Sequence, residues 1–292
     1  MNRNLKEKLT NLAFLLPLFI VFALVIIYPF LYVVKLSFYK ESLSGKLTYV
    51  GLKNYIDLMR SSAFSLSFKN TLVWTLGGVI LKVGGGLIVA LLLFREFKLK
   101  NLFMFIVLIP WAIPYSISHI AWRWMYNALY GHLNSLLLHL RLISTPLEWL
   151  ANPAFSLWGV LIANSWTGVP FCAFSILSGL YAIPIHLFEA ANMDGASRWQ
   201  VFRYVTLPLI MPILLLVSAL AAIWSFTNFG AIWLMAQGGP VNSSTTLIVD
   251  IYRYAFQYNK PGYGNAMSVV SAIFMVILTS VYVIFDKKEE LI

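Results

Sequence analysis

The chain has 292 residues, of which 60% are hydrophobic and only 11% are charged, and its formal net charge is +10. Soluble globular domains contain about 25% charged residues, so this composition excludes a soluble domain and indicates an integral membrane protein. The basic residues are scattered along the chain, which argues against nucleic acid as a partner and favours loops that face anionic lipid in a bilayer. The single cysteine, Cys172, excludes a disulfide framework.

The first apolar run extends from about residue 11 to residue 34 and follows a short basic segment, residues 2–10. It is longer than the hydrophobic core of a signal peptide and has no small-x-small cleavage site, so we expect a retained transmembrane span. A polar segment, 38–68, comes next. Within it, GLKNYIDLMRSS (51–62) predicts a short amphipathic helix at the membrane surface, whose apolar face consists of Leu52, Tyr55, Ile56 and Met59.

Five further apolar stretches are long enough to cross a membrane, at about 70–94, 101–125, 154–181, 209–235 and 263–285. We therefore predict an all-α, polytopic membrane protein with six transmembrane helices. An even number of spans places both termini on the same side of the membrane.

The distribution of lysine and arginine orients these spans. The side that holds the termini contains ten such residues: Arg3, Lys6, Lys8, Arg95, Lys98, Lys100, Arg198, Arg203, Lys287 and Lys288. The opposite side contains eight, spread over much longer segments: Lys40, Lys46, Lys53, Arg60, Lys69, Arg141, Arg253 and Lys260. The higher density of basic residues predicts that both termini are cytoplasmic and that the protein resides in the cell inner or plasma membrane.

A polar interruption separates the fourth and fifth spans, with the sequence PIHLFEAANMDGASRWQVFRYVTLP (184–208). Pro184 suits the first turn of a helix, and Gly195 stands where a left-handed C-terminal residue is favoured. Ser197 and Gln200 have the spacing of a capping box that opens a second short helix. We expect Pro208 to end that helix or to bend it into the next span. Two capped helices joined by a tight turn, on the cytoplasmic side, indicate a rigid docking element.

Motifs for covalent chemistry are missing from the sequence. It contains no GxxxxGK[ST] phosphate loop, no GxSxG motif and no cluster of metal-ligand residues, so we expect no catalytic residue, no metal site and no cofactor. The stretch GGVILKVGGG (77–86) lies within a span, where glycines favour close helix packing. Apart from Lys82 the spans hold almost no ionisable residue at depth, whereas a proton-driven carrier normally has buried Asp, Glu or His relays.

One motif in the polar interruption resembles a known family. EAANMDG (189–195), nine residues and then VTLP (205–208) resemble the EAA motif of ABC importer permeases, with Val205 in place of the usual isoleucine. Further stretches are similar to the carbohydrate-importing, maltose-type branch, whose transmembrane domain is MetI-like: VGLKNYIDL (50–58), LIPWAIP (108–114), WRWMYN (122–127), GGPVNSSTTL (238–247) and IYRYAF (251–256). The resemblance therefore covers nearly the whole chain.

The resemblance implies a type I ABC importer permease fold. The segment 1–69 would hold the N-terminal tail, the first span and an external segment. Residues 70–285 would form the type-1 permease domain, a five-helix core that carries the EAA coupling loop 184–208, and residues 286–292 a cytoplasmic tail. The implied partners are a second homologous permease, which makes a heterodimer, two ATP-binding subunits that hydrolyse the ATP, an extracytoplasmic solute-binding protein and the lipid bilayer. The chain itself would not be an enzyme.

The resemblance also implies which residues couple transport to ATP hydrolysis. In the family the EAA helix sits in a cleft of the ATPase subunit. Glu189 would pair with a basic residue there, the two alanines would allow close approach, and Gly195 would make the turn; the alternative is that Glu189 is only a solvated helix residue. The coupling set is Glu189, Ala190, Ala191, Asp194, Gly195, Leu207 and Pro208.

The substrate path should lie near the bilayer midplane, lined by polar and aromatic side chains of kinked helices. Such residues cluster at 111–115, 164–171 and 224–228. By the resemblance, eight residues occupy pocket positions of maltose-type members: Trp111, Tyr115, Thr167, Gly168, Phe171, Trp224, Ser225 and Asn228. Of these, Gly168 and Asn228 keep the residue type of the family. The alternative for each is helix packing or interfacial anchoring.

Lys82 is the charge that the span pattern does not explain. A mid-span lysine costs on the order of 3 kcal/mol on insertion scales unless it snorkels or pairs. It would snorkel, face the partner subunit or face the cavity, and the last position favours an anionic or phosphorylated substrate.

The sequence as a whole predicts the transmembrane permease subunit of an ATP-driven ABC importer for a sugar, oligosaccharide or polyol. One alternative is an ABC permease for glycerol phosphate or another solute. The other is a secondary carrier, which would need the intramembrane ionisable relays that the sequence lacks.

Overall fold

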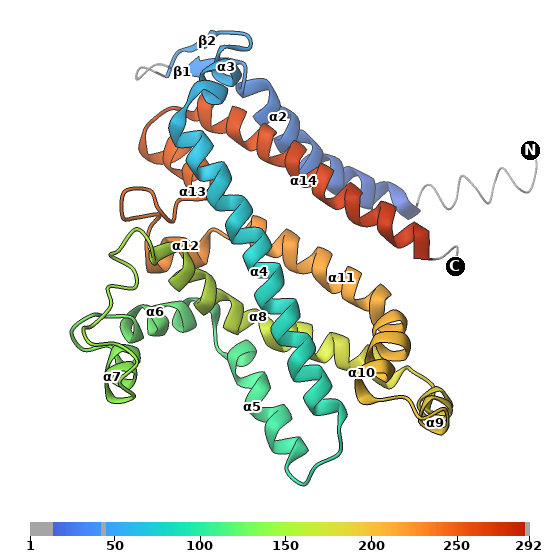
Figure 1. Cartoon of the computed structure of the whole chain (residues 1–292). Helices are drawn as coiled ribbons and strands as arrows, with labels where there is room; N and C mark the ends of the chain where they lie inside the picture. Colours follow the sequence, from blue (N-terminus) through green and yellow to red (C-terminus); the bar gives the residue numbers. More distant parts are fainter. Residues whose placement is uncertain (1–13, 42–44, 290–292) are drawn as a thin grey trace, which may run out of the picture. The chain divides into compact units, whose positions relative to one another are not determined.

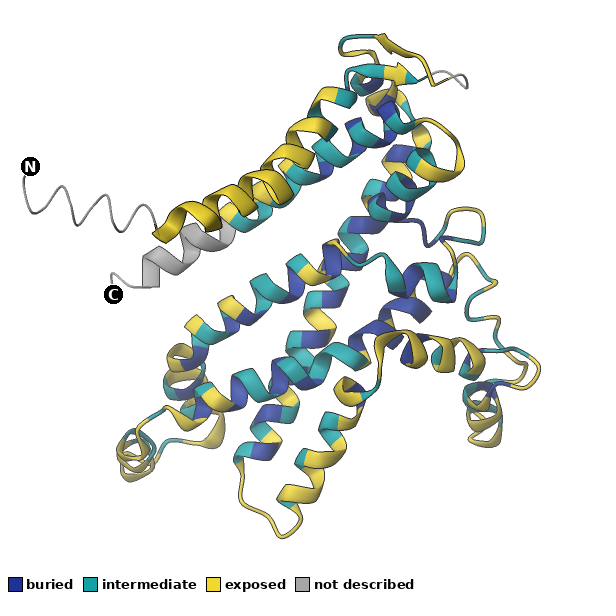
Figure 2. Ribbon diagram, turned by 180° about the vertical axis from the view of Figure 1, so that it is seen from behind, coloured by how far each residue is buried: buried dark blue, intermediate teal, exposed yellow. Residues whose placement is uncertain are grey.

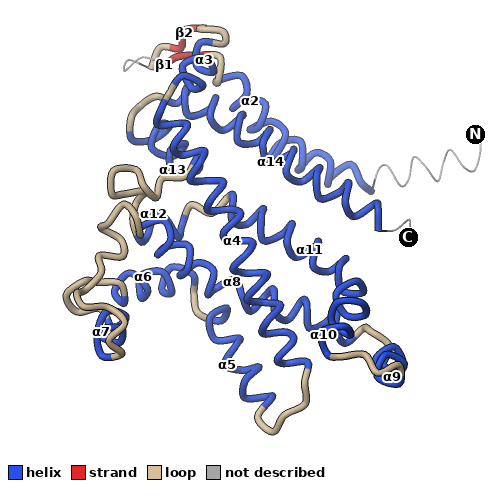
Figure 3. Tube along the Cα trace, viewed as in Figure 1, coloured by secondary structure: helices blue, strands red, loops and turns tan. Residues whose placement is uncertain are grey.

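A computed structural model of the chain describes residues 14–41 and 45–289, with side chains described as far as residue 280. The basic segment 2–10, the first residues of the predicted first span and the last three residues lie outside this part. The chain divides into two compact units, one of residues up to 61 together with 250–273, the other of residues 62–249 together with those from 274 on. Nearly all regular structure in both is helical, as Figure 3 shows.

The predicted six-span, all-α membrane architecture is confirmed. Five helices are long and apolar enough to cross a membrane: Phe14–Leu36, Ser62–Phe94, Ser156–Tyr181, Arg198–Phe226 and Pro261–Ser280. A sixth span forms if the bent pair Lys100–Ala112 and Tyr115–Met125 is counted as one. The first span includes a π-helical turn, η1 (Ala23–Ile27), and α2 (Tyr28–Leu36). Its side chains are exposed along almost its whole length, as expected of a helix that meets lipid or a partner (Figure 2).

In the smaller unit, the segment after the first span forms a hairpin of β1 (Tyr39–Glu41) and β2 (Leu47–Tyr49), followed by α3 (Lys53–Arg60). Asn54 of α3 fixes the hairpin because its Nδ2 donates hydrogen bonds to the carbonyl oxygens of Ser37 and Tyr39, at 2.8 and 2.9 Å. α3 is the helix predicted in this segment. It leaves Leu52, Ile56 and Met59 exposed, so its location at the membrane surface stays a prediction.

The other regular elements of the smaller unit belong to the C-terminal part of the chain. They are the end of α13 (Leu247–Tyr252), η3 (Arg253–Gln257) and the first half of α14 (Pro261–Glu289). The rings of Tyr254 and Tyr263 are in contact, with centroids 4.6 Å apart and planes tilted by 51°, which ties η3 to α14.

The larger unit is built on α4 (Ser62–Phe94) and α8 (Ser156–Tyr181), which pack along each other, with α11 (Leu207–Phe226) packed against both (Figure 1). Glycine allows the approach. A Cβ on Gly86 would stand 2.5 Å from Cβ of Cys172 and 2.9 Å from the backbone nitrogen of Ala173. The predicted role of the 77–86 glycines in helix packing is thereby confirmed for Gly86.

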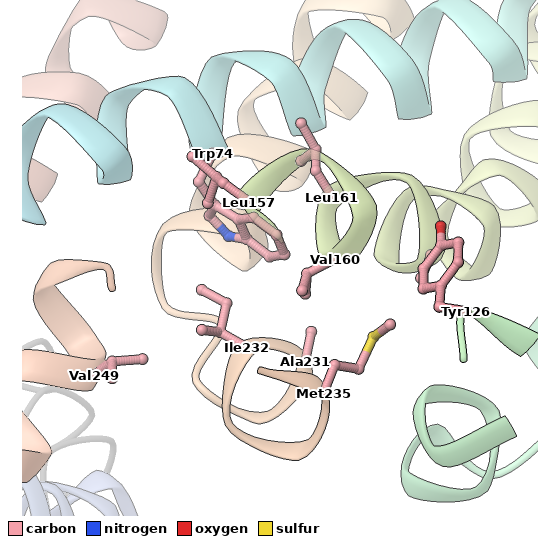
Figure 4. Packing of buried hydrophobic residues seen from close by; sticks show 10 residues of the cluster. Trp74, Tyr126, Leu157, Val160, Leu161, Ala231, Ile232, Met235 and Val249 are labelled. Atoms are coloured by element: carbon pink, nitrogen blue, oxygen red, sulfur yellow. The ribbon is translucent and has the colours of Figure 1, made fainter. Parts of the chain in front are cut away.

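One end of this unit has an apolar core in which α4 and α8 meet α12 (Gly230–Met235) and Tyr126, which follows α6 (Tyr115–Met125). Figure 4 shows Trp74 of α4, Val160 and Leu161 of α8, and Ile232 and Met235 of α12 facing one another. α7 (His132–His139) lies at the edge of this core: its Leu133 packs against the cluster, and the side chain of Asn134 bonds to the backbone of Leu147.

The second span begins at Ser62, so the boundary predicted near residue 70 was wrong by two helical turns. Polar residues misled the pattern there: Ser67 was assigned to the polar segment, but it is buried, as are Asn70 and Thr71, which follow it. Asn70 donates to the carbonyl oxygens of Asn242 and Thr245, and Thr71 to that of Ser67. Buried polar groups with partners cost little, so the helix continues through them.

The third span was predicted as one stretch, 101–125, and this was also wrong. The structure has α5 (Lys100–Ala112) and α6, which meet at an angle of 95°. The break has a local cause: Pro114 disfavours helical geometry at Ile113, and both residues are extended, with ψ of 132° and 133°. The bend turns α6 and its polar residues toward the other helices of the unit.

The fifth span differs from its predicted bounds, 209–235, at both ends. It begins at Arg198 and runs through α10 (Arg198–Val201), η2 (Phe202–Thr206) and α11 to Phe226, and α12 is a separate helix. Pro208 neither ends nor breaks this helix. The backbone N–H of Leu207 bonds to the carbonyl of Phe202, and this widened π turn accommodates a proline that cannot donate to the preceding turn.

Candidate functional site

The segment between α8 and α10 has the local geometry that its sequence predicts. Pro184 immediately precedes α9 (Ile185–Met193), and Gly195 has φ +74°, the left-handed conformation that favours glycine. The backbone N–H of Gly195 bonds to the carbonyl of Asn192 at 3.1 Å. Ser197 and Gln200 form the reciprocal capping box at the start of α10. The element is therefore two helices held by a defined turn.

The predicted coupling residues lie on the surface of this element. Glu189, Ala190, Asp194, Gly195 and Pro208 are exposed, and Ala191 and Leu207 are half-buried. The coupling residues between 189 and 195 lie on α9 and on the turn that follows it, whereas Leu207 and Pro208 are the first two residues of α11. Within the described part of the chain, the carboxylate of Glu189 makes no ion pair. It is available to a group from outside the chain.

Large apolar side chains on the same element are exposed, and the sequence reasoning missed them. They are Ile185, Met193, Trp199 and Tyr204, with Met193 88% exposed. Beside them a groove is lined by Phe94 and Arg95 at the end of α4, Phe188 of α9, and Arg198 and Trp199 of α10. The sequence did contain a signal for this surface, because these large apolar residues stand inside a polar segment between two spans. Exposed apolar patches of this kind mark interaction surfaces.

A second group of polar side chains lies where α6, α8 and the end of α11 meet. The hydroxyl of Tyr115 donates to Oδ1 of Asn228 at 2.8 Å and lies 3.4 Å from Oδ1 of Asn164. Nδ2 of Asn228 donates to the same oxygen of Asn164 at 3.2 Å, and Oδ1 of Asn228 also accepts from the backbone N–H of Ala231, at 3.1 Å. Asn228 is thus the centre of this group; it is half-buried, whereas its partner Asn164 is buried, and such amides need hydrogen-bond partners.

Lys82 joins two further predicted pathway residues. Its Nζ donates to Oγ of Ser225 at 3.0 Å, and its alkyl chain lies against Gly168, where a Cβ would stand 2.8 Å from Cδ of the lysine. The indole of Trp74 donates to the carbonyl of Ser225 at 2.8 Å. The lysine therefore does not snorkel; it is buried between α4, α8 and α11.

The remaining predicted pathway residues differ in their contacts and in their exposure. Phe171 and Trp224 form an edge-to-face pair with centroids 4.8 Å apart, and Trp224 is 50% exposed. Thr167 is half-buried, and its hydroxyl donates to the backbone carbonyl of Asn164. Trp111 does not join these groups: it lies on α5, before the bend, and is 62% exposed.

The structure adds two residues to the eight that were predicted. Asn164 lies inside the polar stretch 164–171 but was not among the predicted pocket positions. His119 is completely buried, with its ring 4.1 Å from that of Tyr115 and its Nδ1 2.8 Å from the Tyr115 carbonyl oxygen. The signal for His119 was its spacing of four residues from Tyr115, which places both on one helix face.

These features agree with a comparison with known proteins. The family described as "Binding-protein-dependent transport system inner membrane component" matches residues 82–290. The chain belongs to this family. The permease is 33% identical over 97% of both chains to the trehalose/maltose transport system permease protein MalF of Thermococcus litoralis. It is 31% identical, over 96% of its own length and 91% of the relative's, to the sulfoquinovosyl glycerol transport system permease protein SmoG of Agrobacterium fabrum.

Solved structures show the same fold. The permease superposes on a chain of a bacterial ABC transporter involved in the import of the acidic polysaccharide alginate with a TM-score of 0.84, at 21% identity and over 98% of both chains. The predicted type I importer permease fold and the resemblance to ABC importer permeases are therefore confirmed. The protein is a multi-pass membrane subunit of a binding-protein-dependent transport system.

Proposed function

We propose that the permease imports a sugar, oligosaccharide or polyol, driven by ATP that is hydrolysed on other chains. The observation that carries the proposal is the group of Tyr115, Asn164 and Asn228 within the membrane-spanning unit. Amide and hydroxyl groups exchange hydrogen bonds with sugar hydroxyls, and the Phe171–Trp224 pair offers an aromatic surface for apolar sugar faces. Relatives named for trehalose/maltose and sulfoquinovosyl glycerol transport support a carbohydrate.

The alternatives have less support. Import of glycerol phosphate or another solute would use the same architecture, and only the substrate would differ. A secondary carrier normally places carboxylates at depth, but α4, α5, α6, α8, α11 and α12 contain no aspartate or glutamate.

We further propose that the permease works with a second homologous permease, two ATP-binding subunits and an external solute-binding protein. Residues 70–285 would form the transport domain, and both termini and the coupling loop 184–208 would be cytoplasmic, as the density of basic residues suggests. The residues that contact the ATPase would be Glu189, Ala190, Ala191, Asp194, Gly195, Leu207 and Pro208.

The geometry supports a direct route for this coupling. α10, η2 and α11 form one uninterrupted helix, Arg198–Phe226, which starts at the capped turn after α9 and ends beside Ser225 and Asn228. A rigid helix carries a displacement of one end to the other. Closure of the ATPase pair on α9 would thus move the pathway residues and turn the cavity from inward- to outward-facing.

The test is reconstitution of the permease with its partner subunits in proteoliposomes. Uptake of labelled sugars and ATP hydrolysis are measured with and without the binding protein. We expect ATP-dependent uptake of at least one carbohydrate. Uptake driven by an ion gradient without ATP would refute the ABC mechanism, and ATP-dependent uptake of non-carbohydrate solutes alone would refute the substrate class.

Asn228→Ala tests the pathway. The change removes the acceptor of the Tyr115 hydroxyl and of the Ala231 N–H. A lost hydrogen bond plus a donor left unpaired amounts to about 1–3 kcal/mol, so we expect substrate affinity or uptake rate to fall by about tenfold. The control is Asn101→Ala, an exposed asparagine at the start of α5. Unchanged uptake in the Asn228 variant would remove this residue from the pathway.

A further inference from the structure

Lys82 is a buried charge that the proposed coupling mechanism does not use. It is 6% exposed and lies on the face of α4 that also holds Thr75, Gly78 and Gly86, all of them buried. This face packs on α8 and α11, so the ammonium group is inside the protein and not at the lipid or water boundary. Ionised groups in such surroundings are normally paired with an opposite charge.

Among the residues that the structure describes, no acidic side chain pairs with Lys82. The helices α4, α5, α6, α8, α11 and α12 carry no aspartate or glutamate, and in the part of the chain that the structure describes Lys82 takes part in no ion pair. Its hydrogen-bond acceptor is the hydroxyl of Ser225, at 3.0 Å. An ammonium has three N–H donors, so this contact leaves donors for further oxygen atoms.

Lys82 contacts residues of the proposed substrate pathway. Gly168 gives the lysine room to cross α8, since a Cβ there would stand 2.8–3.0 Å from its Cδ, Cε and Cγ. Phe171 follows Gly168 by about one helical turn, and Trp224 directly precedes Ser225. The aromatic pair Phe171–Trp224 therefore lies within about one helical turn of Gly168 and Ser225, the two residues that contact the lysine.

We infer that Lys82 recognises an anionic group on the transported carbohydrate, so that the permease selects acidic sugars such as uronates, sugar sulfonates or sugar phosphates. The substrate supplies the counter-charge, its sugar ring stacks on the aromatic pair, and Ser225 holds the ammonium in the absence of substrate. A charged hydrogen bond contributes about 1.5–3 kcal/mol, or roughly 10- to 100-fold in affinity. The inference rests on the proposed function.

The test uses the reconstituted transporter and matched pairs of acidic and neutral sugars, including cellobiouronic acid and cellobiose, and glucose 6-phosphate and glucose. ATP-dependent uptake of each sugar is measured for the wild type and for Lys82→Gln. We expect the wild type to import an acidic member over its neutral partner. In Lys82→Gln we expect acidic uptake to fall by about 10- to 100-fold and neutral uptake to change little.

Two further variants separate recognition from structure. Removal of a buried charge favours membrane insertion, so Lys82→Gln should assemble normally, which size-exclusion chromatography of the complex checks. Ser225→Ala keeps the charge and should keep the preference for acidic sugars, and Lys82→Arg should keep part of it.

Three results would overturn the inference. They are a wild-type preference for neutral sugars, an unchanged preference in Lys82→Gln, and an equal fall in acidic and neutral uptake. The last would identify Lys82 as a structural residue or as the partner of an acidic group on the second permease. Uptake of no carbohydrate at all would refute the proposed function and the inference with it.

Discussion

Glu189→Lys is expected to reduce substrate uptake by about 100-fold or more, because breaking a buried ion pair by removing one partner costs about 3–5 kcal/mol. The lysine would meet the basic residue that we expect Glu189 to contact on the ATPase subunit. Substrate-stimulated ATP hydrolysis should fall to the basal rate together with uptake.

The permease itself should tolerate this change. Glu189 is exposed on α9, and its carboxylate makes no ion pair with the residues that the structure describes. The turn that follows α9 depends on Gly195 and the capping box of Ser197 and Gln200, none of which the substitution touches. We therefore expect normal expression, membrane insertion and thermal stability of the isolated permease.

Glu148→Lys provides the matched control, since it makes the same change of charge at an exposed glutamate in the segment between α7 and α8. It should leave ATPase coupling intact. ATP hydrolysis and uptake are measured in proteoliposomes for both variants. Normal substrate-stimulated hydrolysis in Glu189→Lys would show that Glu189 has no part in coupling.

Gly86→Ala is expected to destabilise the helix pair on which the larger unit is built. The added Cβ would stand 2.5 Å from Cβ of Cys172, 2.9 Å from the nitrogen of Ala173 and 3.0 Å from the carbonyl carbon of Cys172. Two of these atoms are backbone atoms, so no side-chain rotation relieves the contact and α4 must move away from α8. Overpacking of this kind costs about 1–3 kcal/mol.

Gly84→Ala is the control within the same run of glycines. A Cβ at Gly84 meets no atom within 4 Å, and alanine is the better helix former by about 1 kcal/mol. We expect thermal unfolding in detergent to shift down by on the order of 5–10 °C for Gly86→Ala and to stay constant or rise for Gly84→Ala. Equal midpoints for the two variants would contradict the packing that the structure shows.

Local features were predictable from the sequence. The number of spans follows from the length of apolar runs, which depends on the thickness of a bilayer and not on the fold. Gly195 and the Ser197–Gln200 capping box appear as predicted because a helix end is satisfied by residues within one turn of it. A proline disfavours helical geometry at the residue before it, and this holds at Ile113. The sequence analysis nevertheless predicted one continuous span there and not the 95° bend.

Polar residues in apolar surroundings were the main source of error. The boundary near residue 70 failed because a hydropathy pattern treats Ser67 as solvated, whereas it is buried one helical turn before Asn70. Asn70 itself bonds to the carbonyl groups of Asn242 and Thr245, far away in the sequence. His119 was missed, and Asn164 was recognised only as part of the polar stretch 164–171, for the same reason. The pattern of neighbouring residues does not indicate which polar side chains will form hydrogen bonds with each other once the helices have packed.

By itself, the sequence determined the membrane class, the helical composition, the number of spans and the capped element 184–208 with its EAA motif, because each depends on neighbours in the chain or on the solvent. The tertiary structure alone decided that Tyr115, Asn164 and Asn228 form one group. It also placed the ammonium of Lys82 against Gly168 and Ser225. These contacts join helices that are distant in the sequence, and they form only because glycines bring α4 to α8 and the bend at Pro114 turns α6 toward them.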